Sequence, residues 1–459
     1  MGSARGWLAV KVAGSVVLAL AGPAVASDGA RTERISVASD GTQGDEDSFS
    51  SAISADGRYV AFASDATNLV PGDTNGFRDV FVRDRQTGTT SRVNVASDGS
   101  QANHFTPGDG IAISADGRYV TFISFASNLV SGDTNGNYDA FVHDRLTGTT
   151  SLVSVSSTGV QGDVLGFGDM AISADGRYVA FVSGSRNLVH GKTSPTADVF
   201  VRDRWAGTTT RVSLAGDGSE ANGGSFNPAI SADGRYVAFN SFATNLVPGD
   251  VNNEYDVFVR DRFAGTTSMV SVSSAGVQGD TRSFTGLALS ADGRYVTFNS
   301  NASNLVPGDT NEIKDTFVRD RQTGVTSRVS VATDGTQASG GTVFPFGAPF
   351  KVSISWDGRY VAFSTESSNL VPRDTNGFRD VFVRDRWAGT TRRVSVSTEG
   401  AQGDADSSSP SLSADGSDVS FESLASNLVP GDTNGRFDVF VQHRASSIDS
   451  IENHRSNGG

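Results

Sequence analysis

The sequence contains no cysteine and only five histidines among its 459 residues. The first absence excludes disulfides, a thiol nucleophile and Cys-ligated zinc. Five histidines leave little material for acid–base chemistry or for transition-metal sites. Basic residues are also outnumbered, because 37 Lys and Arg face 51 Asp and Glu, for a formal net charge of −14. Phosphate binding needs clustered Lys and Arg, so we expect no nucleic-acid partner.

Long apolar runs are lacking too, apart from one near the N-terminus. Residues 1–26 carry two basic residues, Arg5 and Lys11, followed by an apolar stretch, and they end in an Ala-Val-Ala triplet. This is the pattern of a cleaved secretory signal peptide. The stretch is too short and too interrupted by glycine to predict a membrane span. We therefore expect a secreted or periplasmic monomer without membrane insertion.

Glycine is abundant, with 53 residues, and a heptapeptide of the form SADGRYV recurs along the chain. Its aspartates lie 58 to 65 residues apart. They are Asp56, Asp116, Asp175, Asp233, Asp292, Asp357 and Asp415. A fixed period of this size indicates a propeller, a solenoid or an array of small domains.

Each repeat holds four short segments suited to strands and no useful helical periodicity. In the first repeat they lie around Ala52 and Ile53, and over 58–64, 79–85 and 89–96. These segments are apolar on both faces, which suits sheets that are stacked between neighbouring sheets. Four strands per repeat in a radial arrangement form a propeller blade.

The two ends of the repeat region complement each other. The seventh repeat stops after its third segment, at 438–444, while residues 31–41 match the fourth segment of the first repeat, 89–99. We therefore predict that the N-terminal strand completes the last blade and removes an open seam. The prediction is an all-β, seven-bladed β-propeller of four-stranded blades over residues 27–444, followed by a disordered polar tail, 445–459.

The segment Ser-Ala-Asp-Gly-Arg-Tyr-Val-Ala-Phe resembles the WD-like propeller repeat of the TolB type, in which a Ser-Pro-Asp-Gly turn precedes an apolar strand. The resemblance covers residues 31–444. It implies a propeller, but the same repeat also occurs in peptidases, lyases and scaffolds, so it implies no single function. Unlike TolB, the sequence leaves no room for an α/β domain before the first repeat, and it gives seven blades where six are usual.

A propeller has two faces, and we name them by their connections. The turns between strands one and two and between strands three and four form the hairpin face. The links from strand two to three and from each blade to the next form the link face. On the hairpin face, Asp56 and Gly57 suit a tight turn in which Asp caps its own backbone, so we interpret this Asp as structural.

Six of the seven links between strands two and three carry an Asp-x-Asn-x-x-x-Asp pattern, and the third repeat has only its last Asp, Asp198. Oxygens at positions 1, 3 and 7 match the first half of an EF-hand loop and predict Ca²⁺ as a cofactor, although no bidentate acid follows. The alternative is an Asn-Gly turn with Asx caps. The candidate metal ligands are Asp73, Asn75, Asp79, Asp133, Asn135, Asp139, Asp374, Asn376, Asp380, Asp432, Asn434 and Asp438.

The blade-to-blade links carry a second polar series, which we expect around the mouth of the central channel. Planar amides and carboxylates there suit sugar hydroxyls or peptide groups, with aromatic rings nearby for stacking. The candidate ligand-binding residues are Asp45, Asn103, Asp163, Asn222, Asp280 and Asp404, and the rings are Phe49, Phe105, Phe226 and Phe284.

Catalysis needs different groups around one bond, and the repeats supply few irregular ones. Neither G-x-S-x-G nor H-E-x-x-H occurs. His104 interrupts the repeat beside Asp109 and is the best candidate for a general base. We favour a secreted, non-catalytic propeller that binds a protein or carbohydrate on its acidic link face. The alternative is an extracellular carbohydrate-active enzyme, such as a polysaccharide lyase that uses His104.

Overall fold

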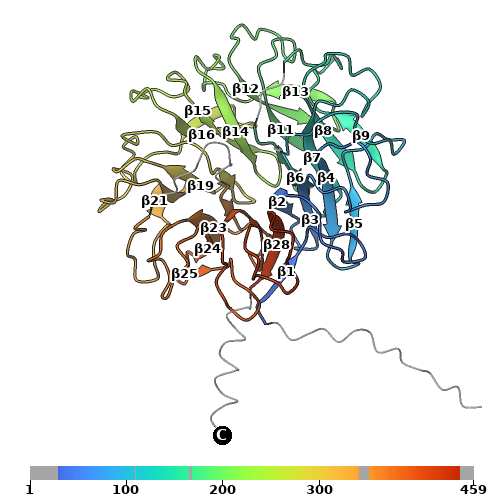
Figure 1. The fold of residues 1–459 in the computed structure, drawn as a ribbon. Helices are drawn as coiled ribbons and strands as arrows, with labels where there is room; N and C mark the ends of the chain where they lie inside the picture. The colour runs from blue at the N-terminus through green and yellow to red at the C-terminus, as the bar shows by residue number, and fades with distance from the viewer. Residues whose placement is uncertain (1–28, 109, 165–167, 341–350, 445–459) are drawn as a thin grey trace, which may run out of the picture.

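The chain forms a ring of seven four-stranded antiparallel sheets, as the repeats predicted (Figure 1). The computed structural model describes residues 29–108, 110–164, 168–340 and 351–444. The predicted signal peptide, the predicted tail and Asp109 lie outside the described residues. Within these ranges no helix is long and apolar enough to cross a membrane.

The first strand of each blade lies innermost and the second strand pairs with it. The first strands are β2 (Ser48–Ile53), β6 (Ala112–Ile113), β10 (Ala171–Ile172), β14 (Ser225–Ile230), β18 (Ala288–Leu289), β22 (Ser353–Ile354) and β26 (Ser407–Leu412). The second strands are β3 (Tyr59–Ser64), β7 (Tyr119–Ser124), β11 (Tyr178–Ser183), β15 (Tyr236–Ser241), β19 (Tyr295–Ser300), β23 (Tyr360–Thr365) and β27 (Asp418–Ser423).

The third strands begin with the last Asp of the Asp-Asn-Asp pattern, and the fourth strands form the outer edge. The third strands are β4 (Asp79–Asp84), β8 (Asp139–Asp144), β12 (Asp198–Asp203), β16 (Asp256–Asp261), β20 (Asp315–Asp320), β24 (Asp380–Asp385) and β28 (Asp438–His443). The fourth strands are β5 (Thr89–Arg92), β9 (Thr149–Leu152), β13 (Thr208–Arg211), β17 (Thr266–Met269), β21 (Val325–Arg328), β25 (Thr390–Arg393) and β1 (Arg31–Arg34).

The closure of the ring is confirmed. Strand β1, from the start of the chain, pairs antiparallel with β28, so that Arg31 faces His443 and Arg34 faces Phe440. Figure 1 shows blue β1 beside red β28. The last blade is therefore built from both ends of the described chain.

The core lies between neighbouring blades. In the first blade Phe62 and Phe81 face each other across β3 and β4, with ring centroids 5.8 Å apart and both side chains fully buried. They pack against Ile35, Val439 and Val441 of the last blade. The opposite side of each sheet carries small Ala and Val side chains that receive the Phe pair of the next blade. Alternating large and small residues thus stack the blades.

On the hairpin face, the residue after the turn serine joins a closed ring of backbone hydrogen bonds. Each amide donates to the carbonyl of the next blade at 2.8–3.0 Å. The seven members are Ala55, Ala115, Ala174, Ala232, Ala291, Trp356 and Ala414. The TolB-type motif has proline at this position, and proline has no N–H to donate. The six alanines and Trp356 each supply the N–H that this ring requires.

Candidate functional site

The predicted metal-binding links hold pairs of buried aspartates, which we call the acid pairs. In the first blade Asp73 and Asp79 have side chains 4% and 0% exposed, and both contact Arg92 of β5. The guanidinium Nη1 lies 3.0 Å from Asp73 and 2.8 Å from Asp79. A cationic side chain therefore already lies between the two carboxylates.

Three other blades repeat this arrangement of one arginine and two aspartates. The groups are Arg328 with Asp309 and Asp315, Arg393 with Asp374 and Asp380, and Arg34 with Asp432 and Asp438. In the last of these the arginine comes from β1, so the closing strand also neutralises an acid pair.

The asparagine between each pair is engaged as well. Asn75 donates through Nδ2 to Asp79 at 3.2 Å and to the carbonyl of Ala102 at 3.3 Å. Its side-chain oxygen accepts the N–H of Phe77 at 3.0 Å, which forms an Asx turn. The side chains of Asn135, Asn376 and Asn434 make the same kinds of contact. The amide thus presents its nitrogen, not its oxygen, to the neighbouring aspartate.

Blades two and four differ, because Leu152 and Met269 stand where the other blades have arginine. In blade two Gln161 donates through Nε2 to Asp133 at 2.7 Å and to Asp139 at 2.8 Å. Gln278 makes the equivalent bonds to Asp250 and Asp256, both at 2.8 Å. A neutral amide compensates less charge than a guanidinium does. Burial accordingly raises the pKa of Asp139 and the pKa of Asp256 to about 6.

Blade three lacks the first aspartate of the pattern and has a lysine in its place. Lys192 replaces the first aspartate, and its fully buried ammonium donates to Asp198 at 2.6 Å. It also donates to the carbonyls of Thr196 at 2.8 Å and Ser194 at 3.0 Å. A basic side chain therefore contacts the buried aspartate in five of the seven blades, and only blades two and four leave the acid pair without a cation among the described residues.

The six candidate ligand-binding residues fasten one link to another. Asp45 accepts the backbone N–H and the hydroxyl of Thr67, both at 2.8 Å. Asp280 and Asp404 each accept the same two hydrogen bonds from a serine. Asn103 forms hydrogen bonds with a serine, and Asn222 forms them with a threonine. The backbone N–H of Asp163 donates to Asn187. None of the six lines the central cavity described below. They act as caps on the links between strands two and three.

His104 lies in an aromatic cluster on the link face. Its exposed ring stacks on Phe77 at 5.4 Å and contacts Phe125 at 4.6 Å, and Phe125 in turn meets Tyr138. The Nδ1 atom accepts the N–H of Phe105 at 2.9 Å. Nδ1 is therefore occupied, and the neutral ring carries its proton on Nε2.

A second aromatic cluster lies on blades four and five. Tyr255 is its centre, with ring centroids 4.5 Å from Phe284, 5.3 Å from Phe242 and 6.4 Å from Phe226. Phe242 is 44% exposed. The sequence indicated Phe226 and Phe284 but not the other two, because those come from the ends of the neighbouring link in the same blade. The repeat alignment could have found them, since Phe125 and Phe242 follow β7 and β15 at the same position.

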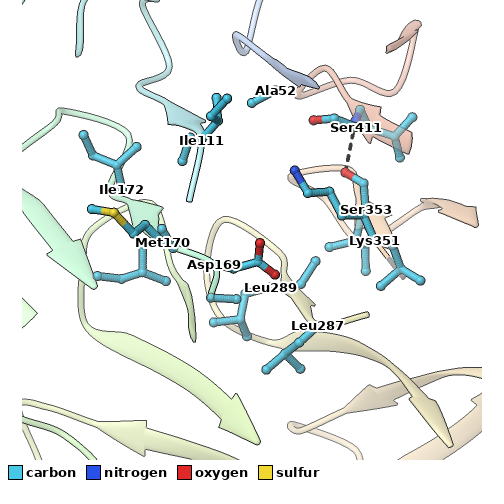
Figure 2. A pocket seen from close by; sticks show the side chains of 18 of the residues that line it. Ala52, Ile111, Asp169, Met170, Ile172, Leu287, Leu289, Lys351, Ser353 and Ser411 are labelled. Carbon is cyan, nitrogen blue, oxygen red and sulfur yellow. Dashed lines mark hydrogen bonds between the residues drawn. The ribbon is translucent and has the colours of Figure 1, made fainter. Parts of the chain in front are cut away.

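The first strands enclose a central cavity of about 280 Å³, shown in Figure 2. Its lining combines aliphatic side chains, among them Ile53, Ile111, Met170 and Leu289, with polar groups such as Ser353. Trp356, a member of the ring of backbone hydrogen bonds, is also one of the residues that line this cavity.

Several solved structures are similar to this fold, although no protein-family model and no curated protein matches the sequence. An oligogalacturonate lyase in complex with manganese matches with a TM-score of 0.54 and 15% identity, over 92% of this chain and 95% of that chain. The oligogalacturonate lyase of Vibrio parahaemolyticus matches with a TM-score of 0.51 and 13% identity, over 90% of this chain and 97% of that chain. TolB from Acinetobacter baumannii matches with a TM-score of 0.39 and 13% identity, over 75% of this chain and 62% of that chain.

The two lyase likenesses show the fold alone: the chain is a seven-bladed propeller similar in fold to oligogalacturonate lyase. The described residues contain no group of three or more His, Cys, Asp or Glu side chains able to hold a metal ion.

Proposed function

We propose that this chain is a secreted, monomeric, non-catalytic propeller that binds a carbohydrate on its link face. The observation that carries the proposal is the pair of partly exposed aromatic clusters around His104 and Tyr255. Aromatic rings beside planar polar groups suit the stacking and orientation of sugar rings. The oligogalacturonate lyases, which share the fold, are by name proteins that act on a carbohydrate, and this supports the ligand class. The repeated aspartates contribute rigidity, because their oxygens are engaged within the links.

The proposal predicts that Phe242→Ala and His104→Ala each weaken binding of a glycan identified on an array by about tenfold or more, as expected when a contacting ring is removed. Trp205→Ala is the matched control, because that ring is 62% exposed but lies on the hairpin-face turn after β12. Calorimetric titration of the three variants measures the effect. Equal affinity in all of them would overturn the link-face site, and a bound protein in place of a glycan would change the ligand class.

The same variants test catalysis. A non-catalytic propeller releases no unsaturated product from acidic polysaccharides, which ultraviolet absorbance detects. Turnover by the native chain that is lost in His104→Ala would establish the lyase alternative instead. Turnover that survives in that variant would exclude His104 as the base.

We propose that calcium binding by the links is confined to blades two and four. In the other blades a divalent ion would have to displace an arginine or lysine that already contacts the buried carboxylates. Among the described residues, the acid pairs Asp133–Asp139 and Asp250–Asp256 have no basic side chain beside them, and their hydrogen-bond partners are neutral glutamine, asparagine and serine side chains. Carboxylate and carbonyl oxygens are the ligands that Ca²⁺ prefers, and the absence of a bidentate acid makes the sites weak.

Millimolar calcium is then expected to raise the melting temperature above that in EDTA. The stabilisation is roughly 1.4 kcal/mol per site at tenfold excess over Kd. A double variant, Leu152→Arg with Met269→Arg, supplies the missing guanidinium and should abolish the calcium response. Leu146→Arg, at a 74% exposed position in the turn after β8, controls for added charge. Superimposable melts of the native chain in calcium and EDTA would show that the links act only as turns and bind no calcium. A calcium response that persists in the double variant would show that calcium binds elsewhere.

A further inference from the structure

The central cavity carries two opposite charges in an otherwise uncharged lining. Asp169 precedes β10 in blade three and Lys351 precedes β22 in blade six, and among the described residues that line the cavity they are the only charged ones. In Figure 2 both side chains point from opposite sides toward the middle of the cavity. They form no ion pair with each other, and neither side chain has a hydrogen-bond or ion-pair partner among the described residues.

Both charges stand at one position of the repeat, four residues before the turn serine. The other five blades place small or neutral residues there, namely Ser50, Gly110, Asn227, Gly286 and Ser409. The fold therefore does not need a charge at this position. Half-buried charges beside aliphatic walls are unfavourable unless they are paired. Asp169 and Lys351 thus have no structural task that the remaining blades share.

The pair defines the ligand by charge. An anion would be repelled by Asp169 and by the net charge of −14, while a cation would be repelled by Lys351. A molecule with one charge of each sign satisfies both. The lining also offers polar groups, but its aliphatic side chains, such as Ile111, Ile172 and Leu287, can contact an apolar body between the charges. The volume of about 280 Å³ lies near the lower end for small-molecule sites.

We propose that the central cavity binds a zwitterionic small molecule with an apolar body, of the class of a free apolar amino acid or a short apolar peptide. Its ammonium group pairs with Asp169 and its carboxylate with Lys351. This site is separate from the aromatic clusters of the link face, and it stands whether or not those clusters bind a carbohydrate.

The test is calorimetric titration of the full chain with leucine, dileucine and trileucine, each with free termini. At least one member should bind with a measurable Kd, and N-acetylation or amidation of that member should each weaken binding at least tenfold. Absence of binding by all three ligands, or equal binding of the blocked forms, would overturn the proposal.

Variants separate the two charges. Asp169→Asn and Lys351→Gln should each weaken binding of the same peptide at least tenfold, while the double exchange of Asp169→Lys with Lys351→Asp should restore it with the ligand reversed. Asp217→Asn, at an exposed turn, controls for loss of one negative charge. Because neither side chain contributes a fold-stabilising contact, the single variants should melt within a few degrees of the native chain. Unchanged affinity in both well-folded single variants would overturn the proposal.

Discussion

A chain that begins at Thr42 is expected to melt far below a chain that begins at Gly29, or not to fold at all. The shorter chain lacks β1, so β28 loses its partner strand and exposes an edge. Ile35, which is 1% exposed, also leaves its contacts with Val439 and Val441. Burial of one such side chain contributes about 1.5–3 kcal/mol.

The larger effect is electrostatic. Removing the strand takes Arg34 and the hydroxyl of Ser36 away from Asp438, whose side chain is fully buried. A buried charge that loses its partner costs about 3–5 kcal/mol. Together with the lost packing, this approaches the whole stability of a typical domain, about 5–15 kcal/mol. Thermal melts and light scattering of the two chains measure the loss.

A permuted chain supplies the control. It begins at Thr42 and carries residues 31–41 after Arg444, joined by Gln-Thr-Gly, the three residues that separate Arg85 from β5 in the first blade. Because β1 then enters the last blade through an ordinary hairpin, this chain should regain the melting temperature of the chain that begins at Gly29. Equal melting of the chains that begin at Thr42 and Gly29 would mean that β1 contributes nothing to the ring.

The seam that β1 closes differs in chemistry from the other blade junctions. At six junctions a tyrosine packs on the turn glycine of the next blade, as Tyr59 does on Gly117. At the seam, Asp418 takes the place of that tyrosine and contacts Arg85 at 3.1 Å. Arg85 also bonds Glu33 of β1. The closing junction is therefore held partly by ion pairs, where the others use an aromatic contact.

The blades and their closure could be predicted from the sequence because they depend on short-range patterns. Alternating apolar residues mark strands such as β3 and β4, and the period of 58 to 65 residues counts the blades. The first strands were less predictable. Four of them hold only two residues, while β2, β14 and β26 extend to six through a bulge. At each bulge one residue, Ser50, Asn227 or Ser409, has a positive φ, and no local sequence motif predicts this conformation.

The chemistry of the links depended on register and was not visible in the motif. Arg92 reaches Asp79 because β4 and β5 pair with Phe81 opposite Arg92. The Asp-Asn-Asp pattern taken alone therefore suggests carboxylate oxygens that are free to bind a metal ion. In the fold, an arginine of the following strand already contacts these oxygens. The signal was present in the repeat, since Leu152 and Met269 interrupt a column of arginines. Asp169 and Lys351 were missed for a related reason, as their repeat position is unremarkable in the other blades.

The second large effect concerns the junction between blades one and two. Gly117→Ala is expected to destabilise the protein by at least about 3 kcal/mol more than Gly132→Ala. Both glycines have positive φ, +72° and +90°, so both substitutions carry the cost of a left-handed alanine, about 1–2 kcal/mol. Only Gly117 has a neighbour: a Cβ there would meet the ring of Tyr59 well under 3.0 Å, while Gly132 has nothing within 4 Å.

Tyr59 cannot move aside without further loss. Its ring lies between the guanidinium of Arg58, at 4.7 Å, and that of Arg145, at 4.4 Å. Arg145 in turn donates to the carbonyl of Gly117 at 2.6 Å, so relief of the clash would disturb this hydrogen bond too. Overpacking of a well-packed contact costs about 1–3 kcal/mol before such losses are added. Denaturant melts of the two variants measure the difference, and a double variant, Gly117→Ala with Tyr59→Ala, should regain part of the stability by removing the obstructing ring. Equal destabilisation by Gly117→Ala and Gly132→Ala would show that the junction yields to the added methyl group, and that the tyrosine does not set the spacing of the blades.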